Sequence, residues 1–180
     1  MVWDRREIID ESTGAQIPVV VQIDIDHAMI HEGRAFTHSE LHTGVAAAGV
    51  SDHLIVTGAN EAHLRQLRFE CSGSPVNLEY YENTVTSADG SSDSLGNNNR
   101  TSDKVSTILL YSAPTITDVG DQMGATLIPA VTNQGGGVGI LSGGEWVLAA
   151  NSKYLIRLIN NDNSAIDYTV TMFFLEPDLK

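Results

Sequence analysis

Cysteine and positive charge are both scarce in this sequence. Cys71 is the only cysteine among 180 residues, so no disulfide can form within the chain and a disulfide-stapled scaffold is excluded. Ten basic side chains stand against 23 acidic ones, a net charge of −13, and they form no basic stripe. Nucleic acids and anionic membranes are bound through such stripes, so we expect neither as a partner.

Long hydrophobic runs are also missing. No segment approaches the roughly 18 apolar residues of a membrane span, and residues 1–7 lack the apolar stretch of a signal peptide. We therefore expect a protein that is made in a cytoplasm and is not exported by that route. Apolar residues still make up 42% of the chain, which is enough for a buried core.

The apolar residues occur in short runs separated by turn-forming residues. The runs are rich in β-branched residues or alternate with polar ones, and none keeps a helical period beyond about two turns. Strands are expected at 17–26, 28–31, 35–37, 52–57, 62–71, 76–81, 104–112, 118–128 and within 143–176. The sequence therefore predicts an all-β fold: one antiparallel β-sandwich or jelly roll over residues 15–180, after an extended N-terminal arm over residues 1–14.

Two strand–turn–strand patterns predict β-hairpins. The clearer one lies between Gly143 and Glu176, around a turn at 160–164. Its second strand alternates strictly, with a core face of Ile166, Tyr168, Val170, Met172 and Phe174. The other joins residues 62–71 and 76–81, with His63, Arg65, Leu67 and Phe69 predicted on one face of the first strand and Leu64, Gln66, Arg68 and Glu70 on the other.

Two aromatic residues fall opposite the apolar faces of these strands. Tyr81 and Phe173 are therefore expected at an interface with another chain or at a second buried face.

Three segments are predicted as loops: residues 41–49, the glycine-rich residues 134–139 and the polar tract 87–103. The polar tract is too long for a tight turn, and loops of that length are usually functional or mobile.

Histidine is concentrated in one part of the chain. The sixth histidine is His63, and the other five lie together at His27, His31, His38, His42 and His53. His27 and His31 would share one face of a strand, so they could form a metal site with Asp24 or Asp26 as an oxygen ligand; a ring of histidines around an oligomer axis is a second possibility. Surface and loop histidines explain the pattern more simply, so we predict no metal and no cofactor.

Catalytic patterns are weak throughout. The segment 89–93 lacks the spacing of a calcium loop, the glycine-rich loop lacks the ending of a phosphate cradle, and Cys71 has no evident activating base. Glu32, Glu40, Glu61 and Glu70 could supply a carboxylate pair for glycoside hydrolysis, but the sequence does not place two of them together. We therefore predict no enzymatic activity and no catalytic residues.

Two segments resemble small virion structural proteins of tailed bacteriophages. The first is Ile30-His31-Glu32-Gly33-Arg34-Ala35-Phe36. The second runs from Gly144-Glu145-Trp146-Val147-Leu148 through Lys153-Tyr154-Leu155-Ile156-Arg157-Leu158-Ile159-Asn160-Asn161 to Met172-Phe173-Phe174-Leu175-Glu176. The second segment resembles a pattern of E-W-x-L, a short turn, Y-L-[IL]-R-[IL]-x-N, and a strand ending in aromatics and Glu. The resemblance covers the first and last quarters of the chain.

The resemblance implies a capsid decoration protein, also called a cement or head-stabilising protein. Such a protein would bind the phage major capsid protein on the outer surface of the virion, as a homotrimer built on a β-sandwich. The arm would supply the capsid contacts, which we expect at Trp3, Arg5, Arg6, Ile8 and Ile9. The alternative is a tail or head-fibre adhesin that binds host-surface glycans through the polar tract 87–103, and the third hypothesis is a carbohydrate-active jelly-roll enzyme.

Overall fold

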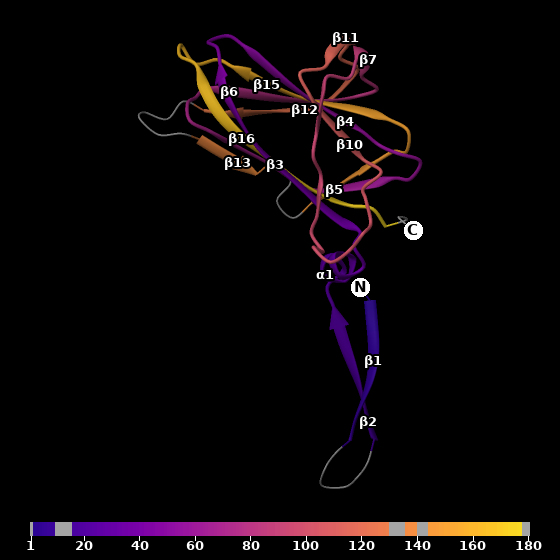
Figure 1. The fold of residues 1–180 in the computed structure, drawn as a ribbon. Coiled ribbons are helices and arrows are strands. Elements are labelled where there is room, and N and C mark those ends of the chain that lie inside the picture. The colour runs from indigo at the N-terminus through magenta and orange to yellow at the C-terminus, as the bar shows by residue number, and fades with distance from the viewer. Residues whose placement is uncertain (1, 10–15, 130–135, 140–143, 178–180) are drawn as a thin grey trace.

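The computed structural model describes residues 2–9, 16–129, 136–139 and 144–177, with side chains for residues 24–129 and 144–177. Antiparallel sheets dominate this part of the chain, and it contains one short helix (Figure 1). The predicted all-β fold class is therefore confirmed, in the form of a β-sandwich.

Two large sheets make up the body of the protein. The first has the strand order β12 (Asp121–Ile128), β6 (Val76–Glu82), β15 (Lys153–Asn160), β4 (Val50–Val56), β10 (Leu109–Ser112) and β8 (Ser91–Asp93). The second has the order β13 (Gly136–Gly139), β5 (Ala62–Cys71), β16 (Ile166–Leu175), β3 (Ala35–Val45) and β9 (Gly96–Asn97), with β14 (Trp146–Leu148) also paired to β5. A separate two-stranded ribbon consists of β7 (Val85–Ala88) and β11 (Thr115–Asp118).

The core lies between the two sheets. The predicted core face of β16 is confirmed, because all five of its inward residues are almost completely buried. They pack against inward residues of the neighbouring β5 and of the facing β6 and β15, such as Phe69, Leu78 and Leu158. Burying each large apolar side chain contributes about 1.5–3 kcal/mol, so this interlayer core is the main source of stability.

The two predicted hairpins are wrong. The strands β15 and β16 lie in different sheets, and so do β5 and β6, so each turn carries the chain across the sandwich. The turn after β15 is closed by Asn160, whose buried side-chain amide donates to the carbonyls of Val45, Ala46 and Ser164 at 2.9–3.0 Å. Strong apolar faces on both strands favour this crossing, because each face then buries against the other across the core.

A bulge changes the predicted faces of β5. Phe173 on β16 pairs with Gln66, and the next residue, Phe174, pairs with Leu64, so Arg65 is left out of the ladder. The extra residue reverses the alternation along the strand. Leu64 is fully buried although the pattern placed it opposite Leu67, and His63 lies on the outer face.

Several predicted boundaries also differ from the structure. Residues 41–45 of the loop predicted at 41–49 belong to the long strand β3. The strand predicted at 104–112 is shorter and consists of β10 alone. The glycine-rich segment contains β13, which extends the sheet beside β5. The polar tract 87–103 contains β8 and β9, which add an edge to each sheet.

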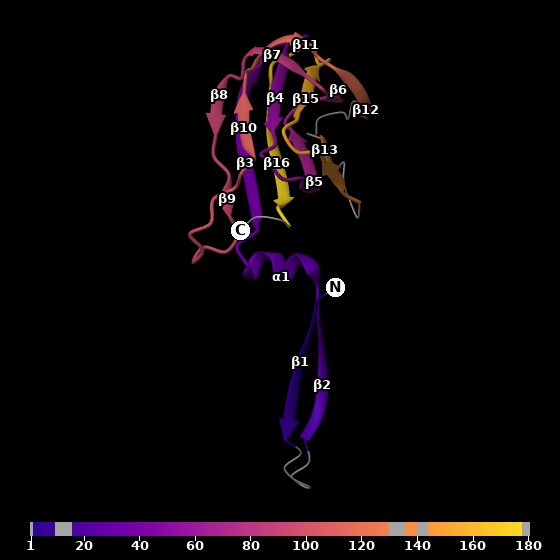
Figure 2. The ribbon, with the colours of Figure 1, turned by 90° about the vertical axis from the view of Figure 1, so that its right-hand side faces the viewer.

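The N-terminal region forms a hairpin and a helix outside the sandwich. Strands β1 (Val2–Ile9) and β2 (Gln16–Ile23) pair only with each other, and they extend away from the sandwich beyond α1 (Ile25–His31) (Figure 2). The strand predicted through residue 26 is wrong at its end, because Asp24 caps α1 and Ile25 is 45% exposed. Residues 28–31 are helical rather than extended. The predicted division between arm and domain at residue 15 stays a prediction, although the pairing joins β2 to β1.

Helix α1 is fastened to the second sheet. Its Met29 packs with Ala35 and Leu175 in a small apolar cluster that Ile30 and Phe173 also contact. The Asp26 carboxylate lies 3.2 Å from the Arg65 guanidinium on β5. These contacts hold the base of the projecting hairpin against the sandwich.

Candidate functional site

The predicted capsid contacts lie in the projecting hairpin. Trp3, Arg5, Arg6, Ile8 and Ile9 all belong to β1, but their side chains lie outside the part of the chain that the structure describes, as do residues 10–14 of the predicted arm. The backbone pairing places the whole of β1 on the far side of α1 from the two sheets (Figure 1).

Tyr81 and Phe173 are each half-buried. Phe173 packs against the small cluster beneath α1, so it covers the contact between the helix and the sheet. Tyr81 lies on β6, and its hydroxyl donates to Glu79 at 2.6 Å. Their predicted role at an interface between chains stays a prediction.

Several polar residues of the segment 144–176, which carries the second resemblance, make structural contacts. Arg157 makes a bidentate ion pair with Asp52 across β15 and β4, with both distances 2.8 Å. The Tyr154 hydroxyl accepts the backbone N–H of Ala149 at 2.8 Å, and Glu176 binds Thr107. These three polar residues therefore have structural roles: Arg157 joins two paired strands, Tyr154 holds the turn before β15, and Glu176 fixes the end of β16.

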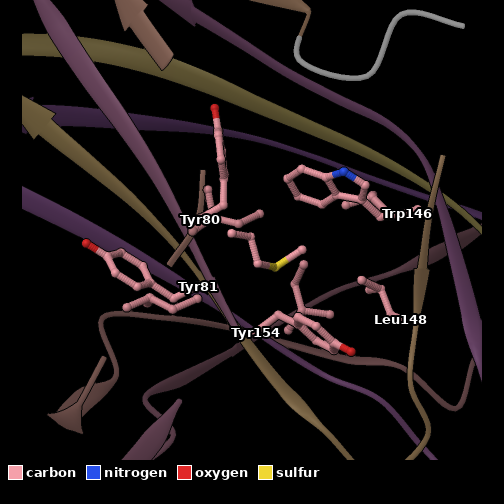
Figure 3. Close-up of a pocket in the computed structure, with 10 residues that line it drawn as sticks. Tyr80, Tyr81, Trp146, Leu148 and Tyr154 are labelled. Atoms are coloured by element: carbon pink, nitrogen blue, oxygen red, sulfur yellow. The ribbon is translucent and has the colours of Figure 1, made fainter. Parts of the chain in front are cut away.

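An apolar pocket lies among the aromatic residues at one end of the core. Tyr80, Tyr81, Trp146, Leu148 and Tyr154 surround it (Figure 3). Its free space is about 10 Å³, close to the minimum that holds one water molecule. It is therefore a gap in packing and not a ligand site.

The six histidines separate into three groups. His27 and His31 meet on the exposed face of α1, with their Nε2 atoms 3.1 Å apart. His63 lies at the surface between Glu61 and Glu145, at 3.4 and 3.3 Å. The other three lie on strands of different sheets, His38 and His42 on β3 and His53 on β4, and the rings of His42 and His53 are 4.7 Å apart.

His53 belongs to a buried hydrogen-bonded cluster. Its Nε2 lies 2.5 Å from the Tyr168 hydroxyl, which also bonds Ser51 at 2.7 Å, and the His42 ring stacks on Tyr168. Burial lowers the pKa of His53 to about 3, and His42 and His38 act in the same direction. His53 is therefore neutral at ordinary pH, and its role is to satisfy Tyr168 inside the core.

His38 opens into a polar pocket. The pocket has a volume of about 340 Å³ and is lined by His38, Ser39 and Glu40 of β3 and by Ser92, Asp93 and Ser94 at the end of β8. Because β3 and β8 belong to different sheets, the pocket lies where the open edges of the two sheets meet. The ligand atoms of His38, Glu40 and Asp93 all lie within 4.8 Å of one another.

The His/Asp site considered around His27 and His31 does not form with Asp24 or Asp26. Asp24 caps α1 and Asp26 binds Arg65, while His27 and His31 contact each other on the helix. Asp93 comes from the polar tract and was not predicted beside His38. The signal on the chain was the pair His38 and Glu40, two residues apart and hence on one face of a strand.

The four glutamates considered for glycoside hydrolysis each lie beside a basic side chain. Glu32 faces Arg34, Glu61 faces His63 and Glu70 faces Arg68, at 2.5–3.4 Å, while Glu40 lies beside His38 and His42. Cys71 is buried, and its burial raises the pKa of the thiol to about 11, which opposes a nucleophilic role.

Comparison of the chain with family models, with curated proteins and with solved structures finds no match. Among the described residues, the only helix is far too short to cross a membrane.

Proposed function

We propose that this protein is a virion structural protein that binds the outer surface of a phage major capsid lattice and stabilises the head. The resemblance of its terminal segments to phage virion proteins provides the class of partner. The projecting β1–β2 hairpin is the observation that carries the proposal, because it supplies a docking element separate from the sandwich.

An isolated two-stranded hairpin has little stability of its own in water. Here β1 and β2 pair with no further strand among the described residues, so each keeps an unpaired backbone edge. Such edges bind other chains by strand addition or are covered by a partner surface. A capsid lattice would provide that surface and would order the hairpin when it binds.

The sandwich supports a homotrimeric arrangement. Strand β12 forms an edge of its sheet among the described residues and exposes Met123 and Leu127, the latter at 59%. Exposed apolar edge strands favour association, so a neighbouring copy would cover β12 and the adjacent Tyr81. The trimer itself follows from the resemblance.

We also propose that the winding is a jelly roll. In the strand orders β12-β6-β15-β4 and β13-β5-β16-β3, the chain changes sheet at each step along these eight strands except between β6 and β12, which pair with each other. Two interlocked Greek keys produce such an order. Jelly rolls occur in viral capsid domains and in lectins, so this description is compatible with both the capsid and the adhesin hypotheses.

Binding to heads tests the proposal directly. Purified full-length protein is incubated with heads of the phage that encodes it, assembled without decoration protein, and the bound fraction is measured by co-sedimentation. We expect saturable binding, and we expect the double variant Arg5→Glu, Arg6→Glu to bind at least tenfold more weakly.

The matched control is Arg68→Glu with Arg100→Glu, which makes the same change in net charge at exposed positions of the sandwich. It should bind as the unmodified protein does. Equal losses of head binding in both double variants would contradict a contact through the hairpin. Absence of binding by the unmodified protein would reject the capsid function.

The alternative is an adhesin that binds host-surface glycans. The polar pocket beside Ser92, Asp93 and Ser94 favours it, because this pocket is open and belongs partly to the polar tract 87–103. Under this alternative the purified protein should bind host cells and leave undecorated heads unbound, which is the reverse of the expected result.

A further inference from the structure

We infer that His38, Glu40 and Asp93 form a binding site for a divalent transition-metal ion, with Zn²⁺ as its representative, that joins the open edges of the two sheets. His38 and Glu40 lie on β3 and Asp93 lies on β8 of the other sheet. The three side chains line one polar pocket and bring their ligand atoms within 4.8 Å of one another.

The buried side chain of His38 is oriented as a metal ligand would be. The side chain is 4% exposed, and its Nδ1 lies 2.9 Å from the carbonyl oxygen of Ser94. A carbonyl only accepts, so Nδ1 donates to Ser94 and Nε2 is the ring nitrogen left to bind a ligand in the pocket. Metal-binding histidines are commonly held in this way, by a backbone carbonyl on the other ring nitrogen.

The Nε2 atom of His38 faces a carboxylate. Glu40 Oε2 lies 3.6 Å away, and neither atom has a hydrogen-bond partner. Such a contact is favourable when a cation, either a proton or a metal ion, lies between the two atoms. In tetrahedral zinc sites the bonds of 2.0–2.2 Å place neighbouring ligand atoms about 3.4 Å apart, close to the 3.6 Å between His38 Nε2 and Glu40 Oε2.

Asp93 completes the set from the other sheet. Its Oδ1 accepts a hydrogen bond from the Ser112 hydroxyl at 3.1 Å, which orients the carboxylate, while its Oδ2 is buried without a partner. Nearby, His42 Nε2 is also unpartnered and lies 3.3 Å from Glu40 Oε2, out of line for a hydrogen bond.

Unpartnered polar atoms are concentrated in this pocket and at the neighbouring His42. Seven buried side-chain nitrogen or oxygen atoms lack a hydrogen bond in the described part of the chain, and four of them belong to His38, Glu40, His42 and Asp93. Buried polar groups nearly always find a partner, so this concentration points to a bound ligand. Two carboxylates offset the charge of a divalent cation, and the acidic chain attracts cations generally.

The mixed donor set selects the class of metal. An imidazole nitrogen with two carboxylate oxygens suits Zn²⁺ and related first-row ions better than Ca²⁺ or Mg²⁺, which prefer all-oxygen sites. Because the pocket is open to solvent, water would fill the fourth position. The ion would act as a clamp between β3 and β8, independently of the capsid hypothesis.

The test uses the full chain with the substitution His31→Gln, which removes the exposed His27–His31 pair as a second zinc site. The protein is stripped with EDTA, dialysed and titrated with ZnCl₂ by calorimetry, and its Tm is measured with and without zinc. We expect one Zn²⁺ per chain and a higher Tm with zinc, since a ligand that binds the folded state stabilises it.

Two further substitutions, Glu40→Gln and Asp93→Asn, keep the shape of each side chain while removing its charge. Each should weaken zinc binding at least tenfold and should abolish the rise in Tm. The matched control His63→Gln alters another histidine that lies between two carboxylates and should leave zinc binding unchanged.

Three results would overturn the inference. One is no zinc binding by the parent protein even at millimolar zinc. Another is undiminished binding by both Glu40→Gln and Asp93→Asn. The third is tighter binding of Ca²⁺ than of Zn²⁺, which would exclude the class of metal.

Discussion

Glu176 is a carboxylate that the fold buries almost completely. It is 1% exposed, and its two oxygens accept the backbone N–H of Thr107 at 3.0 and 3.3 Å, while the Thr107 hydroxyl also donates to it. The side chain therefore fastens the segment before β10 to the end of β16. Burial of the group is tolerated because its oxygens are hydrogen-bonded.

Removing this carboxylate should destabilise the sandwich. We expect Glu176→Ala to lower the free energy of unfolding by about 1–3 kcal/mol, because it leaves the Thr107 N–H and hydroxyl without an acceptor. Glu176→Gln keeps one acceptor oxygen and should lower it less. Urea denaturation measures both, with Glu70→Ala as an exposed control that should change stability by about 0–1 kcal/mol. Equal effects of Glu176→Ala and Glu70→Ala would contradict this role.

At the scale of elements, the bulge in β5 decides which side chains enter the core. Leu64 and Leu67 are both fully buried although an odd number of positions separates them, because Arg65 is left out of the pairing with β16. The bulged Arg65 then reaches Glu145 at 2.7 Å and Asp26 of α1. The bulge thus joins the sheet to the base of the hairpin.

The bulge predicts effects of very different size on stability for two residues that regular alternation places on the same face. Leu64→Ala should lower the free energy of unfolding by about 2–5 kcal/mol, since it leaves a cavity in the core. Gln66→Ala should change it by less than about 0.5 kcal/mol, since Gln66 is exposed. Urea denaturation of the two variants measures this difference, and a small effect of Leu64→Ala would argue against the bulged register.

At the scale of the whole molecule, the protein has two parts with different structural support. The sandwich buries strand faces on both sides of a shared core, whereas β1 and β2 form a sheet of two strands without a second layer among the described residues. Local opening requires less free energy where few buried contacts are lost. The hairpin should therefore open far more often than the sandwich.

Hydrogen exchange of the free protein should show this difference. Backbone amides in β1 and β2 are expected to exchange faster than those in β15 and β16, which are central strands of the two sheets. Addition of undecorated heads should protect the amides of β1 and β2 and leave those of β15 and β16 unchanged. Protection of β1 and β2 as strong as that of β16 in the free protein would contradict this description.

Local sequence patterns determined the all-β fold and the buried face of β16. Strict alternation of apolar and polar residues is a property of neighbouring positions, so it specifies strand and face wherever the ladder stays regular. The same patterns indicated most strand positions. Composition alone excludes an internal disulfide, because the chain has a single cysteine.

Only the tertiary structure decided which strands pair and which side chains meet. An apolar face can bury in a hairpin or across a sandwich, so the pattern of β15 and β16 did not distinguish the two, and the bulge at Arg65 depends on the pairing with β16. The polar pocket is equally non-local, since 56 residues separate His38 from Ser94. Contacts between sheets are set by the packing of the whole core, and no local period encodes them.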